Sequence, residues 1–294
     1  MRRGLALMGL CWLVASGAAA RDHERTPTTT ARPAAPTAEA PDVCDAVADG
    51  MPDGPLRTSL HDGELGQART PCPRSEVAAG ATGLIVADVA NFYGNVVLSA
   101  NLWGAWDIDG GTTGAFAAVE AVRYQTVISS VTAEHIGPGH VSVGMTRRLL
   151  RAASATLGVG GRLVLPTALL LYDNAWPVGL DVGLGGGLAP TPRLRLFAEV
   201  GAQASWAFGS GPADPRAGFR ITTAAAYRLL SWLAVASQAE LSMGWAAALD
   251  VVAVGLGLRL AFGQHLGAEV GVLFPIAGRD RTDLAGALRV GWRL

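Results

Sequence analysis

The sequence predicts an all-β protein, a transmembrane antiparallel β-barrel of about twelve strands that follows a signal peptide and a loop-rich N-terminal segment. Three observations predict this fold. An apolar leader marks the chain for export, and apolar residues alternate with small or polar ones through most of the remaining chain. The connections between these segments are short and long in alternation, which is typical of bacterial outer-membrane barrels.

The leader has the three parts of a secretory signal peptide. Arg2 and Arg3 precede an apolar run over residues 5–14, and small residues end at Ala20. We therefore expect residues 1–20 to be a signal peptide that is cleaved after Ala20. An exported chain with a β-barrel pattern implies the outer membrane of a Gram-negative bacterium, with the N-terminal segment in the periplasm.

Two segments are expected between the leader and the barrel. Residues 21–41 are rich in Thr, Pro and Ala and predict a disordered linker. Residues 42–80 read as a loop-rich periplasmic segment that contains Cys44 and Cys72. In an oxidising periplasm these two cysteines predict a disulfide that closes a loop of about 28 residues and contributes roughly 3 to 4 kcal/mol. A metal site is the alternative, but only His61 is near enough in sequence to add a ligand.

Residues 81–294 carry the barrel pattern. Strands are predicted at 84–90, 95–107, 115–128, 140–150, 155–167, 176–190, 194–208, 219–231, 232–244, 248–263, 266–278 and 283–294. An even number of strands returns the C-terminus to the side on which the chain entered. The connections at 151–154, 189–193, 230–232 and 263–265 are short, whereas those at 129–139, 168–175, 209–218 and 278–282 are longer or more polar and are expected to be extracellular. The short connection at 243–247 is an exception on the extracellular side.

The hairpin at residues 140–166 shows the pattern most plainly. In its second strand Leu157, Val159 and Leu163 share one face, while Gly158 and Arg162 share the other. A soluble antiparallel sheet has the same alternation, so a secreted β-sandwich stays open as an alternative. The recurrence of the pattern down an exported chain favours the barrel.

Charged and polar residues recur on the parity opposite the aliphatic residues and predict the lumen lining. The predicted lining residues are Arg162, Asp181, Arg195, Glu199, Gln203, Arg220, Gln238, Glu240, Arg259, Glu269 and Arg289. They either form a structural network that fills the interior or line a pore that selects solutes. Their near-balanced signs favour the structural network. Tryptophans near predicted strand ends suit the lipid headgroup level, and they are Trp103, Trp106, Trp176, Trp206, Trp232 and Trp245.

Composition excludes several function classes. The formal net charge of −1 argues against a nucleic-acid partner. All 23 basic residues are arginine, so lysine-dependent chemistry such as Walker A phosphate binding or Schiff-base formation is excluded. No motif indicates a cofactor or a metal site, and we expect neither.

Two segments resemble a known family. The stretch EHIGPGHVSVGMTRRLL, followed by LGVGGRLVLPT, is similar to the G-x-G-D strand, basic turn and L-P-T-G strand end of the outer-membrane barrel family called MetA-pathway of phenol degradation. Gly137 and Gly139 match the glycines, whereas His140 stands where the family has Asp, and Ala168 follows Leu165-Pro166-Thr167 in place of Gly. The resemblance implies a barrel that moves hydrophobic or aromatic compounds.

An enzymatic alternative comes from His140 and Ser142. Residues two apart on one strand share a face, so the pair could act as base and nucleophile, as in outer-membrane lipid hydrolases that carry H-x-S-N. Val143 replaces the Asn, and parity directs both side chains to the lumen instead of to lipid. We therefore expect no enzyme, and a polar residue at a strand start explains His140 better.

The sequence thus predicts a passive channel or transporter for small hydrophobic or aromatic molecules. Its expected partners are outer-membrane lipid, the barrel-assembly machinery and such solutes. A structural or surface-exposed barrel without transport is the main alternative, and a lipid-modifying hydrolase that uses His140 and Ser142 is the weaker one.

Overall fold

The structure is a computed structural model. It describes residues 73, 75–88, 92–130, 132–152, 154–167, 175–209, 216–244, 249–263, 266–278 and 284–293. The chain divides into two units, residues 1–38 and 39–294, and every described residue belongs to the second. The signal peptide, the linker, Cys44 and Cys72 lie outside the described residues, so those predictions stay as they are.

The described residues form thirteen β-strands. They are β1 (Glu76–Asp88), β2 (Tyr93–Asp107), β3 (Thr113–Ile128), β4 (Ala133–Gly137), β5 (Val141–Ala152), β6 (Ala155–Leu165), β7 (Ala175–Thr191), β8 (Leu194–Gly209), β9 (Arg216–Leu230), β10 (Leu233–Gly244), β11 (Leu249–Phe262), β12 (Leu266–Ala277) and β13 (Leu284–Arg293). Within the described part of the chain, no helix is long and apolar enough to cross a membrane.

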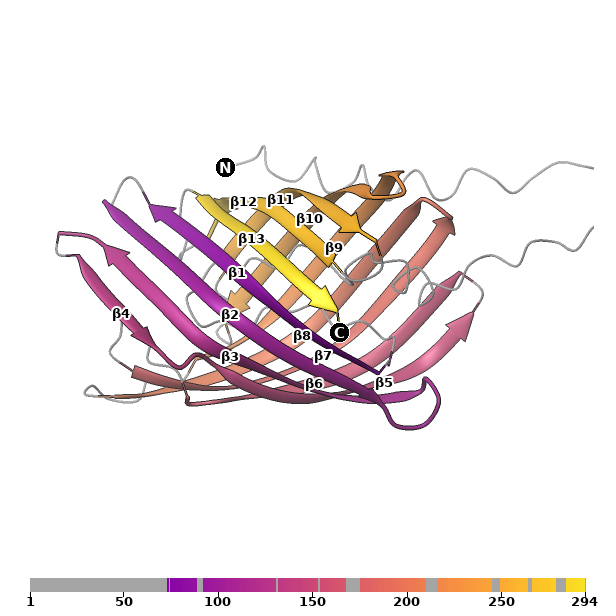
Figure 1. The fold of residues 1–294 in the computed structure, drawn as a ribbon, viewed down its shortest axis with the longest axis horizontal. Coiled ribbons are helices and arrows are strands. Elements are labelled where there is room, and N and C mark those ends of the chain that lie inside the picture. Colours follow the sequence, from indigo (N-terminus) through magenta and orange to yellow (C-terminus); the bar gives the residue numbers. More distant parts are fainter. Residues whose placement is uncertain are drawn as a thin grey trace, which may run out of the picture. The chain divides into compact units, whose positions relative to one another are not determined.

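The strands close into an antiparallel barrel of twelve positions (Figure 1). Apart from β4, successive strands of the barrel pair with one another, and β1 pairs with β13 from Ala78 opposite Arg293 to Ala87 opposite Leu284. The short β4 and the longer β5 both pair with β3, at different levels, and so share one position. The predicted twelve-stranded barrel is confirmed.

Two details differ from the predicted strands. The first strand begins at Glu76, earlier than predicted, because it pairs along its full length with β2. The predicted loop at 129–139 contains β4, which pairs with β3 through only five residues. Pro138 follows β4 and has no N–H to donate to a ladder, which is one reason why β4 and β5 are separate strands.

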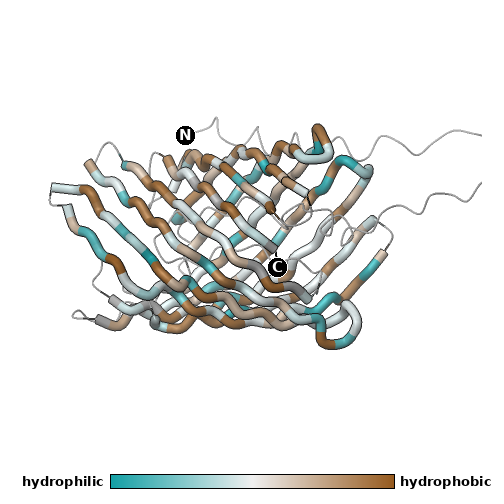
Figure 2. The backbone as a smooth tube through the Cα atoms, viewed as in Figure 1, coloured by the Kyte–Doolittle hydropathy of each residue, from teal (hydrophilic) through white to brown (hydrophobic). Residues whose placement is uncertain are grey.

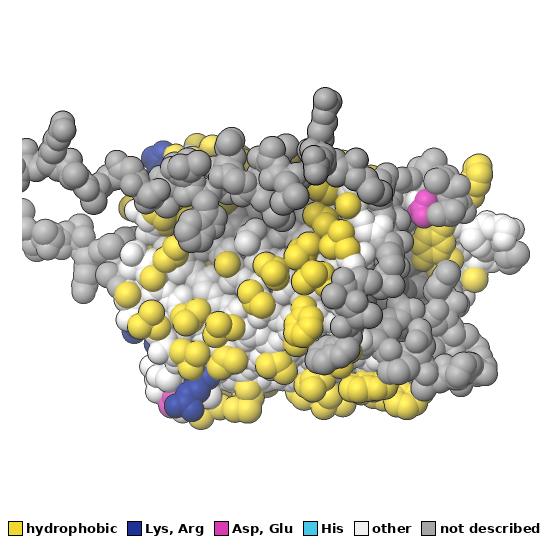
Figure 3. Space-filling model, turned by 180° about the vertical axis from the view of Figure 1, so that it is seen from behind, with side chains coloured by type: hydrophobic (Ala, Val, Ile, Leu, Met, Phe, Trp, Pro, Cys, Tyr) yellow, Lys and Arg dark blue, Asp and Glu magenta, His cyan; other side chains and the backbone are white. Residues whose placement is uncertain are grey.

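Side chains alternate between the two faces of the wall. Along β7, Val182 and Leu184 are exposed on the outer surface, while Asp181 between Leu180 and Val182 is buried. Figure 2 shows the same alternation of hydrophobic and hydrophilic residues along the strands. On the side seen in Figure 3, hydrophobic side chains spread over the wall, and the charged side chains in view lie near its edges. This outer surface suits a hydrocarbon environment, because charged side chains there destabilise a barrel.

Connection lengths identify the two ends of the barrel. Glu76 and Arg293 lie at one end, where two to five residues join successive strands. At the other end, between four and nine residues separate the strands, and residues 245–248 make one of the shorter connections there. In bacterial outer-membrane barrels the end with the short turns and both termini is periplasmic, so we expect the same orientation here and name the two ends accordingly.

The periplasmic turn between β2 and β3 is held by two aspartates. The Oδ1 atom of Asp107 accepts hydrogen bonds from the N–H groups of Asp109 and Gly111, at 3.3 and 2.7 Å. Asp109 in turn accepts from the N–H groups of Thr113 and Thr112, and these bonds lower the pKa of its carboxyl group. Gly110 and Gly111 adopt φ values of 74° and 95°, a backbone conformation that residues other than glycine rarely adopt.

Candidate functional site

The candidate functional site is the inner wall of the barrel, and its largest charged cluster spans β6 to β9. Arg162 on β6 lies directly opposite Asp181 on β7, with 3.8 Å between the guanidinium nitrogen and the carboxylate oxygen. Arg220 on β9 lies 3.7 Å from Asp181 and 3.3 Å from Glu199 on β8. Arg162 and Asp181 are 3% and 2% exposed. Two guanidinium groups and two carboxylates therefore share one buried network, as buried charges require.

Arg195 and Gln203 on β8 lie on the same face as this network. Arg195 is buried and donates through Nη1 to the carbonyl oxygens of Thr191 and Leu194, at 2.8 and 3.2 Å. Gln203 is half-buried and lies opposite Asp181 on the neighbouring strand. These contacts place Arg195 near the periplasmic end of β8, away from the network around Asp181.

The remaining predicted residues lie on the four strands β10 to β13. The Gln238 amide donates to Glu240 at 3.4 Å on β10. Arg259 on β11 lies directly opposite Glu269 on β12, with a 3.2 Å contact between their side chains. The backbone of Arg289 on β13 also lies opposite Glu269, and the side chain of Arg289 is outside the described residues. Lining of a solute path by these residues stays a prediction.

A polar cluster that was not predicted from the sequence lies where β4 ends and β5 begins. The Glu120 carboxylate on β3 accepts a 2.9 Å hydrogen bond from the backbone N–H of His140 and lies 3.4 Å from the Arg123 guanidinium. Both Glu120 and Arg123 face inward although they are three residues apart. A β-bulge at Ala121 explains this, because Ala100 pairs with Val122 and the next residue of β2 pairs with Glu120.

The two motif segments meet at this break. The Thr167 hydroxyl accepts from the N–H of Val141 and donates to the carbonyl oxygen of Gly139, each at 2.9 Å. Gly139 fits there because a Cβ atom would collide with the Cβ of Glu120 and would lie 3.0 Å from its carbonyl oxygen. Gly139 and Thr167 thus join the two matched segments into one structural unit.

The inner face of β1 and β2 has a different chemistry. Asn101 on β2 donates from Nδ2 to the Thr82 hydroxyl on β1 at 2.9 Å, and the Gln125 amide donates to Asn95 at 3.4 Å. Asn95 and Gln125 are fully buried, and Ser99, which lies between Asn95 and Asn101 on the same face of β2, is buried as well. The sequence does contain an indication of this polar face, because Asn95, Ser99 and Asn101 all have odd numbers along β2 and therefore share one side of the strand.

Trp103 corrects an expectation from the sequence. Its ring lies 3.2 Å from where a Cβ of Gly80 would be and 3.0 Å from the corresponding position of Gly291. Gly80 shares the parity of Thr82, which bonds Asn101 in the lumen, so Trp103 faces inward and not toward lipid. Trp106, by contrast, is half exposed on the outer surface.

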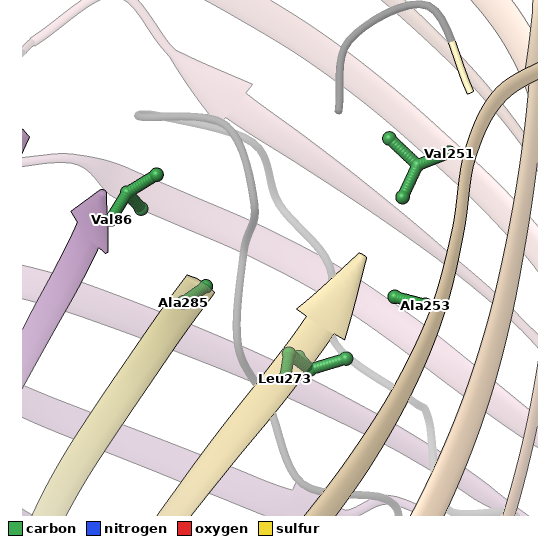
Figure 4. Close-up of a cluster of buried hydrophobic side chains, with 5 residues drawn as sticks. All are labelled: Val86, Val251, Ala253, Leu273 and Ala285. Carbon is green, nitrogen blue, oxygen red and sulfur yellow. The ribbon is translucent and has the colours of Figure 1, made fainter. Parts of the chain in front are cut away.

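An apolar cluster lines the extracellular end of the lumen over β1 and β11–β13 (Figure 4). It consists of Val86, Val251, Ala253, Leu273 and Ala285, with Leu84 packed against it. These residues come from strand ends that are neighbours in the barrel. The inner wall is therefore apolar at one end of these strands and charged further along them, at the Arg259 and Glu269 pair.

The proposed dyad of His140 and Ser142 can be located directly. Both residues are buried and face the lumen. Within the described residues neither ring nitrogen of His140 has a hydrogen-bond partner, so the structure records no bond between the imidazole and the serine hydroxyl. Across the same residues, no group of three His, Cys, Asp or Glu side chains could hold a metal ion.

The chain is similar to several solved structures. An outer membrane channel from Pseudomonas putida F1 is 13% identical with a TM-score of 0.55, covering 80% of this chain and 100% of that one. The NanC porin is 12% identical with a TM-score of 0.46, over 74% and 100% of the two chains. The KdgM porin in complex with disordered oligogalacturonate is 12% identical with a TM-score of 0.45, over 74% and 97%. No protein-family model and no curated protein matches the sequence.

The likeness to the Pseudomonas channel supports the fold that the strand pairing establishes. The twelve-position closed barrel, its apolar outer face and its polar inner face together fit a bilayer around the wall. The protein is an outer-membrane β-barrel.

Proposed function

We propose that the protein is a passive outer-membrane channel for small hydrophobic or aromatic compounds. The observation that carries the proposal is the row of glycines on the inner face of β6 and β7. Gly158 and Gly160 share the parity of Arg162, and Gly183 and Gly185 share the parity of Asp181. A barrel of roughly eight strands is just filled by its own side chains, so a wider one lined by glycine keeps room for a solute.

The charges of the lumen support a channel without strong ion preference. The network over β6–β9 pairs two arginines with two carboxylates, and Arg259 pairs with Glu269. Paired charges of opposite sign leave little net field along the lumen, whereas rings of one sign select ions. The eleven lining residues predicted from the sequence have this role in the proposal.

The apolar cluster at the extracellular end supports the solute class. Val86, Val251 and Leu273 make this end of the inner wall apolar, and an apolar solute gains free energy by leaving water for an apolar environment. The two segments that resemble the phenol-degradation barrel family point to the same class, and we propose membership of that family on this basis.

The test is single-channel conductance of the purified full-length protein in planar bilayers. We expect discrete conductance steps for the natural protein. Gly160→Phe places a ring on the inner face and should lower the conductance. Gly161→Phe is the matched control, because Gly161 is on the outer face and a Cβ there meets only the Asp181 carbonyl oxygen at 3.8 Å.

Two results would overturn the proposal. Natural protein that inserts and shows no conductance would identify a structural barrel. Equal conductance of Gly160→Phe and the natural protein, in barrels that both show heat-modifiable gel mobility, would mean that ions do not pass along the glycine face.

A further inference from the structure

The break between β4 and β5 holds a buried imidazole. His140 is 8% exposed, and neither Nδ1 nor Nε2 has a hydrogen-bond partner within the described residues. Buried polar side chains nearly always have partners, so this ring is an exception in the wall. Such a place suits a neutral imidazole far better than a protonated one, because burial of an unpaired charge costs much more free energy than burial of an unpaired neutral group.

The charged side chains that act on this ring are already paired with one another. On β3, the Glu120 carboxylate lies 3.4 Å from the Arg123 guanidinium. On β6, Arg162 forms its own ion pair with Asp181, at 3.8 Å. The charges of Glu120, Arg123 and Arg162 all act on the His140 ring. A proton on the imidazole would therefore add one positive charge to a set of side chains that is balanced without it.

The backbone around the ring is fixed by Glu120 and Thr167. The His140 N–H donates to the Glu120 carboxylate at 2.9 Å, and the His140 carbonyl oxygen accepts from the Glu120 N–H at 2.8 Å. The Thr167 hydroxyl accepts from the Val141 N–H and donates to the Gly139 carbonyl oxygen. We call these five residues the joint. It ties β3 and the start of β5 to the residue pair that follows β6, at the extracellular end of that strand.

We propose that the joint is an acid-sensitive latch, closed while the His140 ring is neutral and open once the ring carries a proton. A protonated ring draws the Glu120 carboxylate toward itself, in competition with the His140 N–H and with Arg123, and the hydrogen bonds of the joint are released. In the open joint the ring meets water, where imidazole takes up a proton below about pH 6.5. Each further unit of pH favours opening by about tenfold until the closed form is protonated as well. The latch concerns the wall itself and does not depend on the solute.

The test is hydrogen–deuterium exchange of the full-length protein in lipid vesicles, measured at about pH 7.5 and about pH 4.5 and corrected for the intrinsic pH dependence of amide exchange. We expect the peptide that contains residues 139–141 to exchange at least about tenfold faster at the lower pH. His140→Gln keeps a polar side chain that takes up no proton in this range, and it should show no such increase. His135→Gln removes the other histidine of this region, on β4, and should respond as the natural protein does.

Four results would overturn the latch. The first is equal exchange of the natural protein at the two pH values, which needs no variant. An increase that persists in His140→Gln would assign the acid response to Glu120, and an increase that is lost in His135→Gln would assign it to His135. An equal increase in the peptides of β10 and β11 would show general loosening of the barrel in acid. His140→Asn repeats the test if His140→Gln gives no barrel with heat-modifiable gel mobility.

Discussion

The inner faces of β6–β9 and of β1–β2 are two walls of one lumen built from different chemistry. Over β6–β9, Arg162, Asp181, Glu199 and Arg220 form ion pairs across neighbouring strands. On β1–β2 the central contact is a neutral hydrogen bond between Asn101 and Thr82. The outer faces of the two walls are alike, with exposed aliphatic side chains on both. Lipid therefore dictates one face of every strand, and the other face is free to differ around the ring.

The two walls should also differ in how much stability is lost when one polar side chain is removed. Asp181 lies between two arginines, so removal of one charge leaves others buried without compensation. Asn101 can lose its partner and leave only a neutral group unsatisfied. The charged wall should accordingly be the more sensitive of the two to single substitutions.

The largest expected effect is Arg220→Met. It keeps the volume of the side chain but leaves Glu199 and Asp181 with one counter-charge fewer, and we expect a loss of about 3 to 5 kcal/mol in the free energy of unfolding. Urea unfolding of the barrel in lipid vesicles, followed by gel mobility, measures it. Thr222→Val, a neutral change two residues along the same inner face, is the control. Equal losses in the two variants would show that the charge network has no special role.

Arginine on the outer surface should affect both walls equally. Leu98 on β2 and Leu180 on β7 are 51% and 44% exposed. Leu98→Arg and Leu180→Arg should each destabilise the barrel by about 2 to 4 kcal/mol if they lie near the bilayer midplane. The yield of folded barrel in vesicles of defined lipid reports the cost. A large difference between the two would mean that the outer faces are not equivalent.

The smallest expected effect is Asn101→Ala on the neutral wall. It removes the 2.9 Å hydrogen bond to Thr82 and should cost about 1 kcal/mol. The same urea titration measures it, and Ala100→Ser on the outer face of that strand serves as a comparison. A cost as large as that of Arg220→Met would remove the distinction between the two walls.

The outer face could be predicted well from the sequence because lipid imposes one simple rule. Leu184, Val200 and Leu256 need only be apolar and on alternating positions to be recognised, and the structure exposes all three. The same alternation placed Arg162 and Asp181 on the opposite face, where they are buried. Period-two patterning is local, so it can be read without knowing which strands are neighbours.

The missed features depend on contacts between distant residues. Strict alternation puts Glu120 and Arg123 on opposite faces, and only the bulge at Ala121, visible as a register shift against β2, brings both inward. The amphipathic ring of Trp103 would suit the lipid headgroup level or the lumen equally. It faces the lumen because Gly80 and Gly291, on two other strands, leave space for it there. Both features depend on residues of neighbouring strands, so the sequence of the strand that carries Glu120 or Trp103 does not show them.

The ten paired positions that join β1 to β13 have a consequence for biogenesis. The first and last strands are separated by almost the entire barrel sequence, and on that side the backbone groups of each strand pair with those of the other. The ring cannot be sealed until synthesis and export of the whole chain are complete. Removal of β1 or of β13 should therefore prevent the barrel from forming, instead of giving a narrower barrel.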